Sequence, residues 1–265
     1  SDGQLHKKAE LIDLINIDFG PIHPLTGPVY VEEAEVGDIL AVDLIDIELH
    51  DYGWQAIVGG FGFLTDRFPE PKLNIHEIDT INKTTMFNGK ITIPLKPFPG
   101  VMGVAPDTEE MLSTIPPRAN GGNMDDPSIV EGTTVYFPVF VKGALFSIGD
   151  AHAVQGLGEV CGTALESPMT ITYRLRVIKD KPAIQEPQYE TDDYYAVTGF
   201  GDTIDKAAKK AVNFMIDYLV ANYDISDEDA YMLCSLVGDL KIAEVVDVPN
   251  MLVTMHFPKS ILTQL

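Results

Sequence analysis

Residues 39–49, with the sequence ILAVDLIDIEL, restrict the fold of this chain more than any other stretch. Successive side chains of an extended strand point to opposite faces, and here both faces are largely apolar. A strand of this kind is expected to lie between two layers. A second alternating run, MTITYRLRVI at 169–178, and the run of valines and aromatics at 135–146 predict further strands. The chain is therefore expected to be rich in β-structure.

The last third of the sequence changes character. The segment 203–223 repeats apolar residues at helical spacing, which predicts an amphipathic helix. Ser226 with Asp229 resembles a capping box and opens a second predicted helix that ends near Gly238. Residues 181–193, rich in proline and acidic residues, indicate a connector across the surface. We therefore expect a β-rich part at 1–180 that carries the active site, and an α/β subdomain at 181–265 packed on it or intertwined with it.

Charge and cysteine content exclude several classes of function. Acidic residues outnumber basic ones by 40 to 18, and the formal net charge is −22. Nucleic acids and anionic membranes attract basic surfaces, so neither is an expected partner. The sequence contains two cysteines, shows no apolar run long enough to span a bilayer, and does not open with a signal peptide. These features favour a cytoplasmic location.

The segment Ser147–Thr163, SIGDAHAVQGLGEVCGT, is the strongest functional signal. Asp150 and His152 are two residues apart, so an extended backbone would point both side chains to the same face. Gly156 and Gly158 permit a tight reversal, which would bring Glu159 back beside them. Two carboxylates and an imidazole on one wall suit a metal with nitrogen and oxygen ligands. An ordinary solvated hairpin with clustered polar residues is the alternative interpretation.

Other segments offer further candidates. Asn120, Gly121 and Gly122 lie in an irregular loop whose amide and N–H groups could donate to a substrate oxygen. Gln155, between His152 and Glu159, is a further candidate for substrate binding. His23 is a second imidazole, in a loop rich in proline and glycine, and could join the metal ligands.

Several of these segments together resemble the acetamidase/formamidase family of amide hydrolases. The resemblance rests on GPVYVEEAEVGDILAVDLIDIE, PFPGVMGVAP, STIPPRANGGNMD, FSIGDAHAVQGLGEVCGTALE, YYAVTGFGDTIDKAAKKAVNFMIDYL and SLVGDLKIAEVVDVPN, which cover nearly the whole chain. It implies a mainly β fold of the sandwich or jelly-roll kind, with a small α/β subdomain towards the C-terminus. It also implies hydrolysis of short aliphatic amides, such as formamide and acetamide, to ammonia and a carboxylate. Family members usually have a strand-bearing segment before the part that resembles SDGQ, and strand edges left without it would favour a homo-oligomer, a dimer or larger.

The expected mechanism uses a divalent metal, zinc first and calcium as the alternative, held by Asp150, His152 and Glu159 with or without His23. Glu159, if it is not a ligand, is the best general base. Two other interpretations stay open: an amidase that uses Cys161 as its nucleophile, and a non-catalytic sandwich, an inactive homologue that binds a metal or a sugar. A pocket walled by Trp54, Phe61 and Phe146 is expected to admit formamide and acetamide and to reject aryl amides and peptides.

Overall fold

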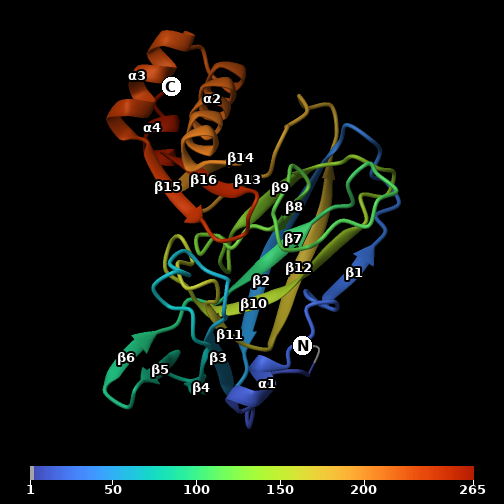
Figure 1. Cartoon of the computed structure of the whole chain (residues 1–265). Coiled ribbons are helices and arrows are strands. Elements are labelled where there is room, and N and C mark those ends of the chain that lie inside the picture. Colours follow the sequence, from blue (N-terminus) through green and yellow to red (C-terminus); the bar gives the residue numbers. More distant parts are fainter. Residues whose placement is uncertain (1–2) are drawn as a thin grey trace.

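The computed structural model describes residues 3–265, and its main feature is two large antiparallel sheets (Figure 1). The first sheet has the order β6-β5-β4-β3-β11-β10-β7-β8, with β1 paired to β10 in addition. The second has the order β12-β2-β9-β13-β14-β16-β15. The mainly β fold expected from the sequence is confirmed.

The strands of the first sheet are β1 (Leu25–Val29), β3 (Tyr52–Ile57), β4 (Lys72–Asp79), β5 (Thr84–Phe87), β6 (Ile91–Pro94), β7 (Phe98–Gly103), β8 (Gly121–Asn123), β10 (Phe146–Val154) and β11 (Leu165–Glu166). Those of the second sheet are β2 (Ile39–Leu49), β9 (Thr134–Pro138), β12 (Met169–Ile178), β13 (Gln188–Glu190), β14 (Tyr194–Gly201), β15 (Asp239–Glu244) and β16 (Met251–Pro258). The helices are α1 (Leu11–Ile15), α2 (Ile204–Asn222), α3 (Asp227–Val237) and α4 (Lys259–Leu262).

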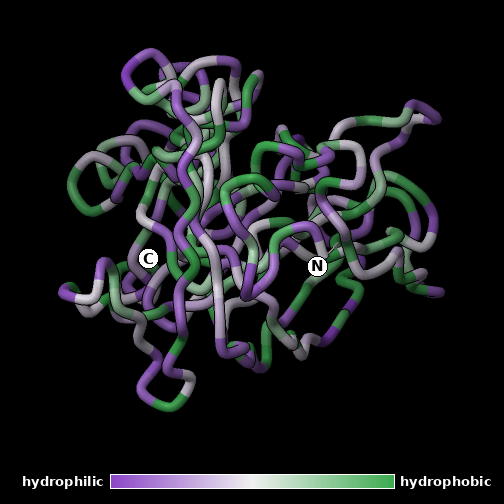
Figure 2. Tube along the Cα trace, turned by 60° about the horizontal axis from the view of Figure 1, so that its bottom comes forward, coloured by the Kyte–Doolittle hydropathy of each residue, from purple (hydrophilic) through white to green (hydrophobic). Residues whose placement is uncertain are grey.

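The main hydrophobic core lies between the two sheets. Its fully buried side chains come from both sheets: Leu40, Val42 and Leu44 of β2 with Phe137 of β9 on one side, and Met102 and Phe146 of β7 and β10 on the other. Strand β2 lies second in its sheet, between β12 and β9, and both of its faces are buried only over its first part, since Ile45 is exposed. Figure 2 shows hydrophobic and hydrophilic residues interleaved along the chain, as expected for strands that bury one face.

Helices α2 and α3 cover one end of the second sheet, at the top of Figure 1. Thr203 and Ser226 cap them, because each side-chain oxygen accepts a hydrogen bond from a backbone N–H three residues on. Met215 and Leu219 of α2 are fully buried against Val253 and Phe257 of β16. Within the described residues, no helix has both the length and the apolar composition needed to cross a membrane.

The connector at 181–193 departs from expectation. It was expected to cross the surface, but it contains β13, which pairs with β9 on one side and β14 on the other. Tyr189 is fully buried. The second sheet is therefore continuous from the β-rich part into the C-terminal part, and the two share strand pairing across residue 180.

A buried polar network holds β13 in the second sheet. The hydroxyl of Tyr189 donates to Asp126 Oδ2 at 2.5 Å and lies 2.9 Å from His256 Nε2. Lys241 Nζ donates to Nδ1 of the same imidazole at 3.2 Å. A lysine ammonium only donates hydrogen bonds, so the imidazole must be neutral with its proton on Nε2. Burial and the charge of Lys241 lower the pKa of His256 to about 3.

This network predicts a pH-dependent loss of stability. The pKa of His256 is about 3 in the folded chain and 6.5 in the unfolded chain. Between pH 3 and pH 6.5 the unfolded chain therefore binds a proton that the folded chain does not. The contribution of His256 to the free energy of unfolding is present at pH 7 and falls by about 2 kcal/mol by pH 5. Burial raises the pKa of Asp126 and has the opposite sign, so the wild type must be compared with His256→Asn. Urea unfolding of both at pH 7 and pH 5, with the surface variant His50→Asn as control, measures the difference. Equal pH dependence in the wild type and His256→Asn would contradict the prediction.

Candidate active site

Strand β10 changes its partner halfway along, and this change creates the site. On one edge it pairs with β1 up to Gly149 and with β11 from His152 onward. Between these two pairings lies Asp150, whose backbone has a φ of 50°. The side chains at this break face a cavity of about 350 Å³ that is also lined by residues of β1, β3 and β11.

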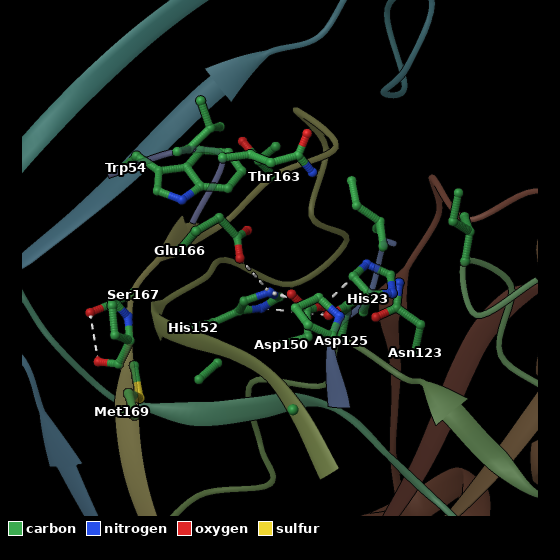
Figure 3. A pocket seen from close by; sticks show the side chains of 18 of the residues that line it. His23, Trp54, Asn123, Asp125, Asp150, His152, Thr163, Glu166, Ser167 and Met169 are labelled. Carbon is green, nitrogen blue, oxygen red and sulfur yellow. Dashed lines mark hydrogen bonds and ion pairs between the residues drawn. The ribbon is translucent and has the colours of Figure 1, made fainter. Parts of the chain in front are cut away.

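His152 lies at the centre of the cluster and is almost completely buried (Figure 3). Its Nε2 is 3.2 Å from Glu166 Oε2 and 3.5 Å from Asp150 Oδ2. Glu166 reaches this position because it is paired with His152 across the β10–β11 ladder. Figure 3 shows Asp150 and Glu166 pointing at the imidazole from two directions.

Gln155 fixes the orientation of this imidazole. Its Nε2 donates to the carbonyl of Asp125 at 2.7 Å, so its Oε1 must be the atom that lies 2.9 Å from His152 Nδ1. An amide oxygen only accepts hydrogen bonds, which places a proton on Nδ1. In a neutral imidazole the lone pair is then on Nε2, the nitrogen that faces Asp150 and Glu166.

Two carboxylates and a nitrogen lone pair directed at one space repel one another unless a proton or a cation lies between them. Without a cation the proton is taken up by the imidazole: burial opposes its charged form, but Glu166 and Asp150 outweigh this and raise the pKa of His152 well above its ordinary value. A divalent metal would meet the same need. Asp150, His152 and Glu166 each offer one ligand atom, and these atoms lie within 4.8 Å of one another. The residues present therefore fit a metal.

A second acidic group lies on the Nδ1 side of the imidazole. Asp125, His152 and Glu159 form another set of possible ligands within 4.8 Å. Gln155 already occupies Nδ1, however, so the set around Nε2 is the better one for a metal. Burial, together with the charge of Asp125, raises the pKa of Glu159 well above its ordinary value. Glu159 is thus a carboxyl group that binds a proton more tightly than usual, next to the group formed by Asp150, His152 and Glu166.

Buried oxygen atoms continue behind this group. Asn123 Nδ2 donates to Asp247 Oδ2 at 2.6 Å, while Asn123 Oδ1 and Asp125 Oδ1 are buried without a hydrogen-bond partner. Burial raises the pKa of both Asp125 and Asp247 well above the ordinary range. Gly100 permits this close packing, because a Cβ there would lie 2.4 Å from Asp125 Oδ1 and 2.8 Å from His152 Cε1.

Three of the acidic residues have a left-handed backbone, which non-glycine residues seldom adopt. The φ angles are 42° at Asp125, 50° at Asp150 and 44° at Glu159. Each such residue costs on the order of 1 kcal/mol, and such strain is concentrated at functional sites. At Asp150 the left-handed residue interrupts the regular alternation of the strand, yet its side chain still meets His152.

His23 also reaches the cluster. Its Nε2 is 3.7 Å from Asp150 Oδ2, and its Nδ1 is 3.2 Å from Thr114 Oγ1. Burial favours the neutral form of Asp150, but the imidazoles of His23 and His152 outweigh it and lower the pKa of Asp150 to about 2. Asp150 is therefore held as a carboxylate.

The sequence-based candidates fall into two groups. The first group lies together in one cluster: His23, Asp150, His152, Gln155 and Glu159. The turn at 156–158 returns Glu159 to this cluster, as expected. Glu159 lies in a group with Asp125 and His152, whereas Asp150 and His152 form a group with Glu166. The expected set of Asp150, His152 and Glu159 is therefore not the one that the structure brings together.

The loop candidates lie elsewhere. Asn120, Gly121 and Gly122 line a different cavity, of about 280 Å³, and Asn120 Nδ2 donates to the carbonyl of Val104. Asn123, from the same loop, lines the main cavity instead. Of the expected aromatic wall, Trp54 and Phe61 line the cavity, whereas Phe146 is fully buried in the core between the sheets.

Glu166 and Asp247 were not among the sequence-based site residues, whereas the loop that holds Asp125 was a source of candidate oxygen ligands. Glu166 and Asp247 carry the same signal as the central segment, because each is an acidic residue inside an apolar run, in TALES and EVVDVP. Their positions depend on strand pairing and on the path of the chain after β15, which spacing along the sequence does not reveal.

The chain is similar to known amidases over nearly its whole length. The family model described as "Acetamidase/Formamidase family" matches residues 1–113 and 108–264. A formamidase from Methylophilus methylotrophus is 27% identical over 336 residues, covering 98% of this chain and 82% of that protein.

Two solved structures have the same fold. A recombinant predicted acetamidase/formamidase from Thermoanaerobacter tengcongensis superposes with a TM-score of 0.92 at 34% identity, covering 99% of this chain and 85% of that one. An acetamidase from Bacillus halodurans gives 0.89 at 33% identity, covering 95% and 84%. Because the family model and these relatives span nearly all of the sequence, this chain belongs to the acetamidase/formamidase family.

Proposed function

We propose that this protein hydrolyses short aliphatic amides, formamide and acetamide among them, to a carboxylate and ammonia. The observation that carries the proposal is the arrangement around His152, with Asp150 and Glu166 at Nε2 and the protonatable Glu159 in the adjoining group with Asp125. The names of the relatives, formamidase and acetamidase, support the same reaction.

The proposed cofactor is a divalent metal, zinc rather than calcium, held by Asp150, His152 and Glu166 with His23 beside them. The imidazole among the ligands favours zinc, since calcium prefers an all-oxygen set. A metal in this position would polarise the amide carbonyl and lower the pKa of a water molecule.

The residues of the chain have separate roles in this proposal. Gln155 orients the His152 ring so that Nε2 faces the carboxylates of Asp150 and Glu166. His23 helps to keep Asp150 ionised. Glu159, whose pKa is raised, takes a proton from the attacking water and passes it to the nitrogen of the leaving ammonia. Water then supplies the oxygen of the carboxylate as the C–N bond breaks.

The thiol alternative is disfavoured by its surroundings. The Cys161 thiol donates to the carbonyl of Ala56 at 3.3 Å. Burial and the charge of Glu159 raise its pKa, whereas a nucleophilic thiol needs a lowered one.

The proposal includes a cytoplasmic homo-oligomer. Both cysteines are free, which suits a reducing compartment. Strands β12 and β15 end the second sheet, and their outer edges can pair with another strand. Size-exclusion chromatography with light scattering tests the oligomer: a particle of 29.0 kDa would contradict it.

The first prediction here concerns the metal. Protein purified without chelator should contain close to one zinc per chain and release ammonia from acetamide, and a chelator should abolish the activity. His152→Ala and Asp150→Ala should each lose most of the metal, because each removes a ligand. His50→Ala, an exposed histidine, is the matched control. Full metal occupancy in both site variants, measured by mass spectrometry, would rule out this ligand set.

The second prediction separates the proton carrier from the thiol. Glu159→Gln should lower kcat/KM for acetamide by about 10²- to 10⁴-fold, because the amide cannot transfer a proton. Cys161→Ala should keep at least about half of the activity, because the thiol has no part in the reaction. Both variants should unfold at a temperature close to that of the wild type. An inactive Cys161→Ala beside a wild type that is insensitive to chelators would favour the thiol mechanism instead.

A further inference from the structure

The cavity in front of His152 has two chemically different ends. One end holds the acidic and imidazole groups described above. The other end is lined by apolar side chains from the N-terminal segment and from β3 and the residue that follows it: Leu5, Leu14, Ile17, Trp54 and Val58. In Figure 3 the ring of Trp54 lies beyond Glu166, on the side away from Asp125.

The apolar end belongs to an incomplete hydrophobic cluster. All five of these side chains are members of a small satellite cluster beneath the first sheet, separate from the main core. Leu5 and Leu14 are buried, but Ile17, Trp54 and Val58 are only half-buried because they face the cavity. An apolar group placed in the cavity would complete this cluster and remove these surfaces from water.

The cavity is much larger than a short amide requires. Acetamide has four non-hydrogen atoms and fills the space of only a few water molecules, each of about 30 Å³. The cavity volume of about 350 Å³ is of the size that encloses larger organic ligands. The volume is therefore not explained by formamide and acetamide.

Charge restricts what can fill the remaining space. Among the described residues that line the cavity there is no lysine or arginine, while Asp150, Glu166 and Asp247 line it. A carboxylate on the acyl group, away from the carboxamide, would be repelled by these acidic residues and would find no lysine or arginine to pair with. Charge therefore disfavours an anionic acyl group, and the apolar end of the cavity favours one that is uncharged and apolar.

We propose that this enzyme also hydrolyses primary amides whose acyl group is an uncharged apolar chain of about four to seven carbons or a single aromatic ring, which replaces the expectation from the sequence that aryl amides are rejected. The carboxamide lies against the His152 cluster, and the acyl group packs on Leu14, Trp54 and Val58. Water attacks the carbonyl carbon, the C–N bond breaks, and the products are the longer carboxylate and ammonium. The inference rests on the proposed amidase function and extends it to a second substrate class.

The test is a substrate series with the wild-type enzyme. Ammonia release is measured for formamide, acetamide, butanamide, hexanamide and benzamide, and for succinamate as a charged analogue. We expect kcat/KM to rise by roughly two- to fourfold per added methylene up to hexanamide, from apolar burial alone. Succinamate should be at least tenfold poorer than butanamide. Hydrolysis of acetamide with a kcat/KM that stays constant or falls along the series would overturn this inference and leave the amidase function intact.

Variants locate the acyl group. Val58→Phe and Ile17→Phe each fill part of the apolar end and should lower the ratio of kcat/KM for hexanamide to that for acetamide by at least tenfold. Val36→Phe, at an exposed valine outside the cavity, is the matched control and should keep the ratio of the wild type. An unchanged ratio in both folded cavity variants would overturn the assignment.

Calorimetry separates failure of this inference from failure of the proposed function. Hexanamide should bind the wild type at least tenfold more tightly than acetamide, whether or not turnover occurs. An enzyme that binds hexanamide in this way but cleaves no amide would contradict the proposed function and support the cavity assignment. Equal binding of the two amides would overturn the inference itself.

Discussion

The structure depends on the convergence of negative charge around one buried imidazole. Asp150 and Glu166 lie within 3.5 Å of His152 Nε2, Asp125 lies 3.5 Å from Nδ1, and Glu159 groups with Asp125 and His152. Such groups repel one another in a medium of low dielectric, so they remain together only with shared protons or a bound cation. The pKa values of the acidic residues are shifted in opposite directions: that of Asp150 is lowered to about 2, and that of Glu159 is raised. The cluster therefore contains one carboxyl group that stays ionised and one that is more easily protonated.

The sheet architecture makes this convergence sterically feasible. Strand β10 loses β1 as its partner before Asp150 and gains β11 at His152, and the space between the two partners opens into the cavity. Gly100 on the neighbouring strand β7 lets Asp125 and His152 approach, because any side chain there would collide with both. The cost of the left-handed backbone at Asp125, Asp150 and Glu159 is offset by the packing of the rest of the fold. Rigid packing of the sandwich thus supports a strained and highly charged site.

Sequence reasoning predicted the local structure where a single pattern dominated. The double-faced run at 39–49, the alternating run at 169–178 and the amphipathic helix after Thr203 correspond to β2, β12 and α2. It was wrong for residues 181–193, because β13 is short and flanked by proline and acidic residues. Tyr189 is buried there only because Asp126 and His256, distant in sequence, satisfy its hydroxyl. Local composition cannot reveal such partners.

Spacing along the chain was enough to predict that Asp150, His152, Gln155 and Glu159 lie together, because they interrupt one apolar run and a glycine turn returns the chain to it. That Glu166 faces Nε2 and that Glu159 groups with Asp125 depends on the register between strands distant in sequence, which spacing does not give. The separation of Asn120, Gly121 and Gly122 from the cavity was likewise decided by how β8 pairs with β7. Spacing in the chain fixes which side chains share a strand face, whereas pairing between distant strands fixes which faces meet.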